Sequence, residues 1–385
     1  MTKKEKEQNK KIKVSFPHMG TVSYAWAATL RIIGCEPYIE PYTSKKTLSL
    51  GTKHSPEAIC IPYKLILGNF IEAIEGGTDY VAMITSPGCC RLGEYGNCIE
   101  NALRDMGYHT KYVEMRLYDG IKGMYDFLKK VSGKNNPLLF SRAIMVAIMK
   151  AFMLDDLETM LSYYRAREIH TDDAEKNYKV CLKLIDGCDT LSGLRKVKKE
   201  IKQEMAKTKI DPKRDVLNVD ITGEIYVVND EFSNQGIERE LGRMGVQVRR
   251  SLTLSSFLKD AIIPKIFRKG ETHLQRAFRL AKPYLMRDIG GDSLECVSDV
   301  VYADQRHVDG IIHLSPFTCM PEIMSQNIFP SMREDHNIPI LALIMDEQTG
   351  KAGYVTRIEA FVDLMRRRKR RNLAKQKQQE TAAAK

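Results

Sequence analysis

The chain of 385 residues has no uninterrupted apolar stretch near the roughly 20 residues needed to cross a bilayer, so no transmembrane helix is predicted. Residues 1–13 are charged and lack the apolar core of a secretory signal. Together these two absences predict a cytoplasmic protein. In that reducing compartment the nine cysteines are not expected to form disulfides, and they are free for packing, metal binding or catalysis.

Sequence motifs for binding phosphate and zinc are missing as well. There is no Gly-x4-Gly-Lys-Ser/Thr loop and no Gly-x-Gly-x-x-Gly after a predicted strand, so nucleotide hydrolysis is not predicted for this chain. Zinc sites usually show close Cys-x2–4-Cys pairs, and no duplicate set of such pairs is present.

The net charge of +11 would suggest nucleic-acid binding if it lay on folded elements. It is concentrated instead in residues 1–13 and 366–385, which together carry a net +12 and leave the body between them near −1. The basic run from Arg366 to Arg371 is typical of a solvated helix end. Nucleic acid is therefore not the expected partner, although weak attraction to an acidic partner stays open.

Strands and helices alternate in two stretches of the chain, separated by residues 119–208, which show only helical patterns. The predicted strands are 13–17, 36–41, 79–85 and 111–115 in the first stretch, and 215–221, 246–250, 310–315 and 339–345 in the second. The predicted helices between them include 22–33, 63–74, 97–106, 235–244 and 352–371. This alternation predicts an α/β fold with two mostly parallel, doubly wound lobes. The expected division is a basic tail (1–12), a first lobe (13–118), a helical region (119–213), a second lobe (214–365) and a basic tail (366–385).

Three cysteines lie where doubly wound domains bind their ligands, at the carboxyl ends of parallel strands. Cys89 and Cys90 follow the predicted strand 79–85 on a loop with glycines, and Cys319 takes the matching place after 310–315. A thiol at a helix N-terminus is favoured as the thiolate, which is the form that binds iron. The coincidence in both lobes predicts a functional role for these positions.

Cys60 precedes Pro62 at another predicted helix start, and Cys98 lies eight residues beyond Cys90. For Cys89 and Cys98 a second interpretation competes with metal binding, namely that each is a loop thiol without a function. Thiolates dispersed in this way fit a cluster assembled between two lobes, although spacing alone favours iron only modestly over zinc. The remaining cysteines are interpreted as buried structural thiols: Cys35, Cys181, Cys188 and Cys296.

Three stretches resemble the cysteine motifs of the 2-hydroxyacyl-CoA dehydratase and CoA-protein activase superfamily, which includes the double-cubane cluster proteins. They are 58–65 (AICIPYKL), 87–95 (PGCCRLGEY) and 316–321 (PFTCMP). The resemblance covers residues 13–365 in layout. It implies two Rossmann-like (flavodoxin-like) lobes that hold an oxygen-sensitive iron-sulfur cluster, and a separate ATP-hydrolysing activator with its own 4Fe-4S cluster.

The resemblance implies one of two clusters. A 4Fe-4S cubane would be held by Cys60, Cys90 and Cys319, with one iron open. A double-cubane 8Fe-9S cluster would need about six thiolates, and here Cys89 and Cys98 bring the set to five. Cys35 would have to be the sixth.

Five charged residues near these motifs are candidates for donating protons or steering an anion: His18, Lys64, Arg91, Glu94 and Glu322. Structural interpretations compete with each role. His18 would shape its loop by hydrogen bonding and Lys64 would be a charge on a helix surface. Glu94 and Glu322 would offset a helix dipole.

The expected function is low-potential, ATP-coupled reduction of a small substrate under anaerobic conditions. Two alternatives are a 2-hydroxyacyl-CoA dehydratase-type component acting on an acyl-CoA substrate, and a non-catalytic cluster carrier. The expected partners are the activator ATPase, the substrate and, as an option, a second copy in a homodimer. A membrane is not expected.

Overall fold

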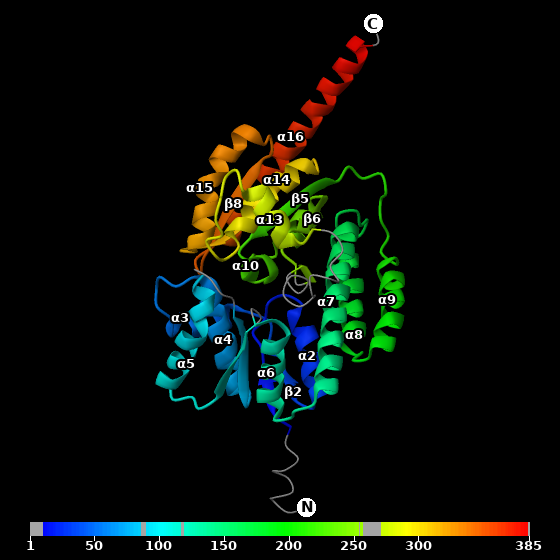
Figure 1. Ribbon diagram of the computed structural model, residues 1–385. Coiled ribbons are helices and arrows are strands. Elements are labelled where there is room, and N and C mark those ends of the chain that lie inside the picture. Colours follow the sequence, from blue (N-terminus) through cyan, green and yellow to red (C-terminus); the bar gives the residue numbers. More distant parts are fainter. Residues whose placement is uncertain (1–10, 86–89, 117–118, 254, 257–270, 384–385) are drawn as a thin grey trace, which may run out of the picture.

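The computed structural model describes residues 11–85, 90–116, 119–253, 255–256 and 271–383. Its strands form two separate four-stranded parallel sheets surrounded by helices (Figure 1). The predicted α/β fold with two Rossmann-like lobes is confirmed. The lobes are stacked end to end in the view of Figure 1, with three long helices along one side.

The first sheet has the order β2-β1-β3-β4. Its strands are β1 (Lys13–Ser15), β2 (Glu36–Tyr38), β3 (Tyr80–Thr85) and β4 (Lys111–Arg116). The helices of this lobe are α2 (Val22–Ile33), α3 (Lys45–Lys53), α4 (Ile61–Glu75), α5 (Tyr95–Asp105) and α6 (Gly120–Ser132). Separate hydrophobic clusters cover the two faces of the sheet, as a doubly wound sheet requires.

Helix α3 is absent from the sequence prediction. Ser44 and Thr47 start it with a capping box, but Gly51 in its last turn weakens the helical pattern. A Cβ atom at Gly51 would lie 1.6 Å from the carbonyl oxygen of Lys64, so the glycine allows α3 to touch the backbone of α4. The close approach buries a face of α4 that the sequence suggests is exposed.

The second sheet repeats the topology of the first, with the order β6-β5-β7-β8. Its strands are β5 (Leu217–Gly223), β6 (Val246–Arg250), β7 (Gly310–Pro316) and β8 (Ile340–Met345). Its helices are α10 (Ile225–Asn229), α11 (Ile237–Arg243), α13 (His273–Ala281), α14 (Ser293–Gln305), α15 (Met320–Asp335) and α16 (Lys351–Ala383). One continuous hydrophobic cluster joins the two lobes, because it contains buried side chains of α4 and β3 from the first lobe and of β5 and β7 from the second. The strand order reverses between β1 and β3 and between β5 and β7, and this fold places its ligand crevice at such a point.

Three helices connect the lobes: α7 (Pro137–Arg165), α8 (Asp173–Asp186) and α9 (Leu191–Met205). They share a hydrophobic core of their own. Helix α7 is the one described helix long and apolar enough to cross a membrane, but half of its most apolar window is buried in the protein. It also carries buried Lys150, which forms an ion pair with Asp189 at 2.8 Å. Its surroundings are those of a helix packed against the rest of the protein.

A largely covered ion-pair network fastens α7 to the second lobe. Arg250 of β6 donates from Nη1 to Glu158 of α7 at 2.8 Å and from Nε to Glu238 of α11. Arg165, also on α7, pairs with Glu175 of α8 at 2.6 Å. Charges buried in this way are stable only while each retains a partner.

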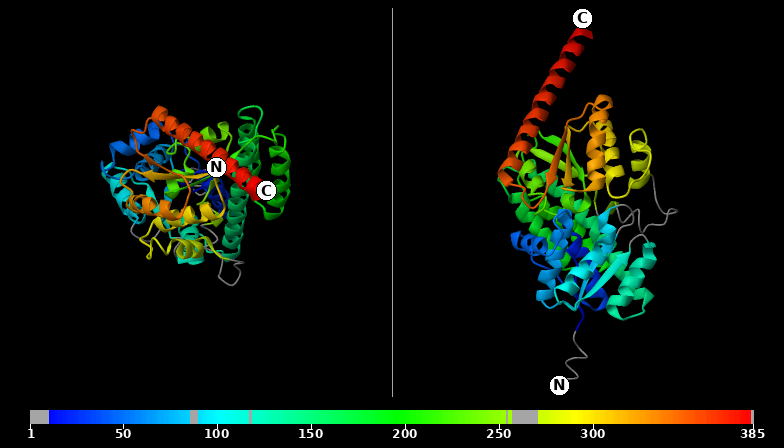
Figure 2. Two further views of the ribbon diagram at one scale, coloured as in Figure 1. Left: turned by 90° about the horizontal axis from the view of Figure 1, so that it is seen from above. Right: turned by 90° about the vertical axis from the view of Figure 1, so that its left-hand side faces the viewer.

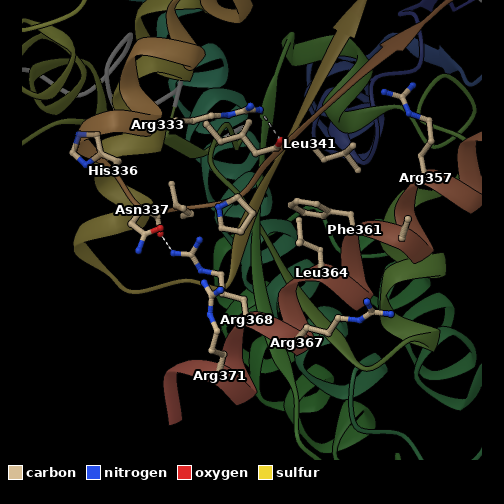
Figure 3. A pocket seen from close by; sticks show the side chains of 14 residues that line it. Arg333, His336, Asn337, Leu341, Arg357, Phe361, Leu364, Arg367, Arg368 and Arg371 are labelled. Carbon is tan, nitrogen blue, oxygen red and sulfur yellow. Dashed lines mark hydrogen bonds between the residues drawn. The ribbon is translucent and has the colours of Figure 1, made fainter. Parts of the chain in front are cut away.

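Helix α16 extends well past its predicted end and projects beyond the second lobe (Figures 1 and 2). Its basic run is only partly solvated, because Lys369 pairs with Asp215 at 2.6 Å and Arg368 donates to the carbonyl oxygen of Asn337. A groove of about 790 Å³ lies between α16 and the start of β8, and several arginines line it (Figure 3). Three of them, Arg333, Arg357 and Arg368, donate hydrogen bonds to backbone carbonyl oxygens.

Replacing Arg250 with alanine should destabilise the protein strongly. The change leaves the carboxylate of Glu158, which is only 15% exposed, without its cation, and such a loss typically costs about 1–3 kcal/mol. Urea unfolding followed by far-ultraviolet circular dichroism measures the loss. Lys198→Ala is the control, because its pair with Asp156 is exposed and should contribute less than about 1 kcal/mol. Equal effects of the two changes would contradict the structural role of the network.

Candidate functional site

Three of the predicted cysteines each occupy the residue just before a helix. Cys60 precedes α4, Cys90 precedes the short 3-10 helix η1 (Arg91–Glu94), and Cys319 precedes α15. Each has an extended backbone, and none uses its side chain to cap its helix. All three cysteines therefore lie at a helix start, where backbone N–H groups have no partner within the helix, and the sulfur of Cys60 also contacts the Tyr95 hydroxyl at 2.6 Å.

Arg91 ties together the segments that carry these cysteines. Its Nη1 donates to the carbonyl oxygen of Ala58 at 3.1 Å, and its Nη2 donates to the carbonyl oxygen of Thr318 and to its hydroxyl at 3.0 Å. The Thr318 hydroxyl donates in turn to Ala58 at 3.1 Å. Ala58 lies two residues before Cys60, and Thr318 directly precedes Cys319. One side chain therefore connects three distant segments from both lobes.

Backbone geometry supports the same convergence. Thr318 has a φ of 66°, a left-handed conformation that is uncommon for residues other than glycine. At Gly291, just before α14, an added Cβ atom would lie 2.6 Å from Pro321 and 3.7 Å from the Cβ atom of Cys90. The start of α14, the start of α15 and Cys90 are thus packed against one another.

Burial dominates the protonation of the three thiols. It raises the pKa of Cys90 to about 12, with further increases from the carboxylates of Glu224 and Asp292 and from Cys60. Burial, Glu224, Glu322 and Cys90 raise the pKa of Cys319, and burial raises that of Cys60 despite its 2.6 Å hydrogen bond with the Tyr95 hydroxyl. Without a metal these cysteines are neutral thiols at pH 7.

Two carboxyl groups beside the thiols escaped the sequence prediction. Glu224 follows β5 and accepts from the N–H of Val227 at 2.9 Å, while Asp292 begins α14 and accepts from the N–H of Ile225 at 2.9 Å. Burial raises the pKa of Glu224 to about 7 and that of Asp292 well above its usual range. Asp292 begins the helix before β7, as Cys60 begins the helix before β3. A position-by-position comparison of the two lobes in the sequence would therefore have indicated Asp292 as a site residue.

The other proposed ligands have different surroundings where the structure describes them. Cys98 lies on an exposed face of α5. Cys35 is buried at the start of β2, the opposite edge of the sheet, with its sulfur 4.0 Å from the carbonyl oxygen of Val131. Cys89 lies outside the described residues. Cys188, predicted to be buried, is partly exposed because it lies in the turn between α8 and α9.

Lys64 is not the surface charge that the sequence suggests. Its side chain is 2% exposed, donates to the carbonyl oxygen of Glu57 at 3.0 Å and pairs with Glu347 at 2.8 Å. Glu347 follows β8 of the second lobe, so this ion pair crosses between the lobes. The contacts with Glu57 and Glu347 hold the ammonium group inside the protein.

The remaining charged candidates differ in environment. The Nε2 atom of His18 lies 2.7 Å from the carbonyl oxygen of Glu40, and the imidazole stacks on Tyr42. Glu94 is exposed and accepts a hydrogen bond from Asn97 at 2.9 Å. Glu322 is fully buried in the first turn of α15 and faces the interior of the second lobe.

The family model described as the CoA enzyme activase uncharacterised domain (DUF2229) matches residues 18–251, more than half of the chain. The chain belongs to this family. The membership supports a place in the CoA-protein activase and 2-hydroxyacyl-CoA dehydratase-like superfamily. The matched segment includes Cys60 and Cys90 and ends before Cys319. No curated protein matches the chain.

Removing the Arg91 side chain should loosen the three segments. We expect Arg91→Ala to raise the rate at which iodoacetamide alkylates Cys319 by roughly tenfold, since the lost hydrogen bonds are worth about 1–3 kcal/mol together. Peptide mapping by mass spectrometry on metal-free protein measures the rate. Arg104→Ala is the control, because Arg104 contacts Asn101 on its own helix. An unchanged rate in Arg91→Ala would show that the segments do not need this side chain.

The buried carboxyl of Glu40 should make stability depend on pH. Burial raises its pKa to about 8, above the unfolded value near 4.5, although Ser15 donates a hydrogen bond to it. The folded state therefore holds an extra proton between these values, and stability from this group falls as pH rises from about 4.5 to 8. Glu40→Gln should remove this decline, so its unfolding free energy should exceed that of the wild type most at pH 8 and above. Parallel slopes for both proteins in urea titrations would refute the assignment.

Proposed function

We propose that Cys60, Cys90 and Cys319 hold an oxygen-sensitive 4Fe-4S cluster, and that the chain carries out low-potential reduction of a small substrate with a separate ATP-hydrolysing activator. The observation that carries the proposal is the Arg91 contact set, which joins the segments of all three cysteines. Membership of the CoA enzyme activase family supports the same superfamily.

The donor set fits such a cluster. In a 4Fe-4S cubane, three thiolates bind three of the four irons and leave the fourth without a protein ligand. Each of the three cysteines here lies at a helix start, where backbone N–H groups stabilise negative charge. Iron would replace the thiol protons that burial otherwise retains. When bound, the cluster would supply a one-electron reducing centre with an open iron.

The chain's own groups would exclude water and supply protons. Cys60, Cys319 and Tyr95 are buried, which keeps bulk water from the sulfur atoms. Glu224 has a pKa of about 7, and one of its oxygens accepts from Val227, so its other oxygen can carry a proton near neutral pH. Glu224 is our candidate for delivering protons during reduction.

The same geometry favours four irons over eight. Cys98 is exposed and Cys35 lies at the far edge of the first sheet, so the described residues bring three thiols together where a double cubane needs about six. Since the sequence has no phosphate-binding loop, we assign ATP hydrolysis to the activator.

A 2-hydroxyacyl-CoA dehydratase-type component is the second candidate, because the description of the family names CoA enzymes. It requires binding of an acyl-CoA, which calorimetry with the purified full chain tests. Reduction of a small substrate without acyl-CoA binding would favour the reductase over this alternative. Cluster binding without any turnover would favour a carrier.

Anoxic purification followed by iron and sulfide analysis and by electron paramagnetic resonance tests the cluster. We expect roughly four irons per chain, and less than about a quarter of that in Cys60→Ser, Cys90→Ser and Cys319→Ser. Cys35→Ser and Cys181→Ser are matched controls at buried thiols and should retain their iron. A colourless wild-type protein without iron would end the proposal, and about eight irons would replace the cubane with the larger cluster.

A further inference from the structure

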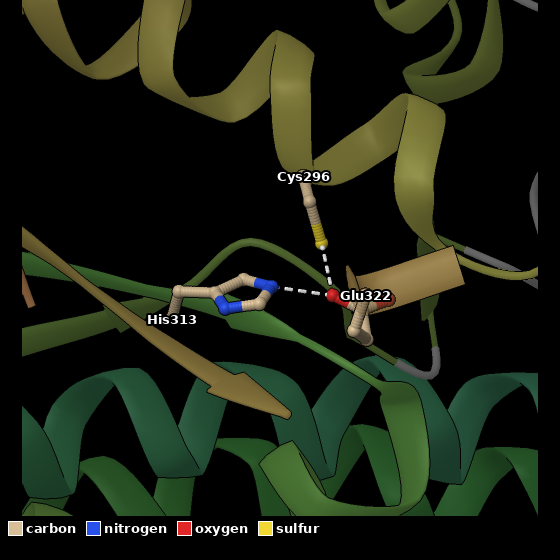
Figure 4. A group of neighbouring side chains, drawn as sticks. All are labelled: Cys296, His313 and Glu322. Atoms are coloured by element: carbon tan, nitrogen blue, oxygen red, sulfur yellow. Dashed lines mark hydrogen bonds and ion pairs between the residues drawn. The ribbon is translucent and has the colours of Figure 1, made fainter. Parts of the chain in front are cut away.

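A second group of buried metal-ligating side chains lies inside the second lobe. Cys296 comes from α14, His313 from β7 and Glu322 from α15 (Figure 4). Their ligand atoms all lie within 4.8 Å of one another, and each of the three residues is fully buried. Glu322 Oε2 is 2.5 Å from His313 Nε2 and 3.3 Å from Cys296 Sγ, so thiol and imidazole both point at one carboxyl oxygen.

The hydrogen bonding of this group is incomplete. The Oε1 atom of Glu322 and the Nδ1 atom of His313 are buried without a hydrogen-bond partner, and such an atom typically costs about 1–3 kcal/mol. No lysine or arginine among the described residues forms an ion pair with Glu322. Two further carboxyls that are partly covered, Asp292 and Glu295, lie close enough for Glu322 to raise their pKa values. This interior therefore has an excess of acceptors and lacks a cation.

A divalent ion would correct that imbalance. One thiolate, one imidazole and one carboxylate are typical zinc ligands, and three protein ligands with an open fourth position are a known zinc arrangement. Zinc with a Cys296 thiolate, an ionised Glu322 and a neutral His313 has no net charge, which suits a site away from water. On binding, the thiol proton leaves Cys296 for solvent as the Zn–S bond forms, with no change of oxidation state.

We propose that Cys296, His313 and Glu322 bind a zinc ion that joins α14, β7 and α15. The Thr222 hydroxyl, 3.4 Å from the Cys296 sulfur, is placed to orient that ligand from the second layer of contacts. The ion would anchor the first turn of α15, which begins directly after Cys319. The site shares no ligand with the proposed cluster and does not depend on it.

Metal analysis of the full-length chain tests the site. After purification, brief incubation with zinc sulfate and desalting, we expect about one zinc per chain by plasma mass spectrometry. His313→Gln and Cys296→Ser should each lose at least about nine-tenths of that zinc. A wild-type chain without zinc, or a His313→Gln variant that retains it, would overturn the proposal.

Matched variants separate ligand loss from general damage. Cys181→Ser removes another buried thiol, and His336→Gln removes another histidine paired with a carboxylate, Asp304. Both should keep a full zinc equivalent. Circular dichroism and gel filtration check that every variant is folded. If one of the two ligand variants does not fold, Glu322→Gln is measured in its place.

Cobalt distinguishes this site from the cluster cysteines. Cobalt substituted into the wild-type chain should give a thiolate-to-cobalt charge-transfer absorption, which Cys296→Ser should abolish and Cys90→Ser should leave intact. The opposite pattern would assign the metal to the cluster cysteines and refute the zinc site. Because iron content is measured on the same samples, loss of zinc and loss of the cluster are scored independently.

Discussion

The arrangement of the candidate site depends on one guanidinium group. Arg91 donates to Ala58 and Thr318, and these two residues lie next to two different cysteine-bearing helix starts, one in each lobe. Hydrogen bonds to exposed groups are individually weak, but a planar fork with several donors fixes direction as well as distance. The left-handed backbone at Thr318 is held in place by the same contacts. Cysteines that are hundreds of residues apart in sequence can meet only if such contacts define how the lobes face each other.

The repeated sheet topology explains which groups arrive at this place. In each lobe, the helix before the third strand and the segment after that strand reach the same edge of the sheet. The first lobe contributes Cys60 and Cys90 in these positions, and the second contributes Asp292 and Cys319. Three thiols and one carboxyl therefore occupy four equivalent positions. The fourth position therefore differs from the other three in carrying a carboxyl group and no thiol.

Buried charges hold the larger parts together. Lys64 pairs with Glu347 across the lobes, and Arg250 connects the helical region to the second sheet through Glu158. Each pair joins segments far apart in sequence, and each would be costly if one partner were lost. None of these roles is visible in the sequence, where a lysine in a helix normally faces solvent. The errors at α3 and Lys64 concern adjoining segments, since Gly51 weakens the helical pattern of α3 and lies against the backbone carbonyl of Lys64.

Local order was readable from the sequence because strand and helix patterns depend on neighbouring residues. The helix Val22–Ile33 and the strand Val246–Arg250 were predicted with their observed limits, and the placement of Cys90 and Cys319 after strands followed from the same patterns. Contacts between distant segments were decided by tertiary structure. Arg91 reaching Thr318, and Cys296 meeting His313 and Glu322, involve separations of 227 and up to 26 residues with no motif to connect them. The spacing of apolar side chains along a helix or strand shows which of its faces is buried. Which other element packs against that face is decided only when the sheets and helices assemble.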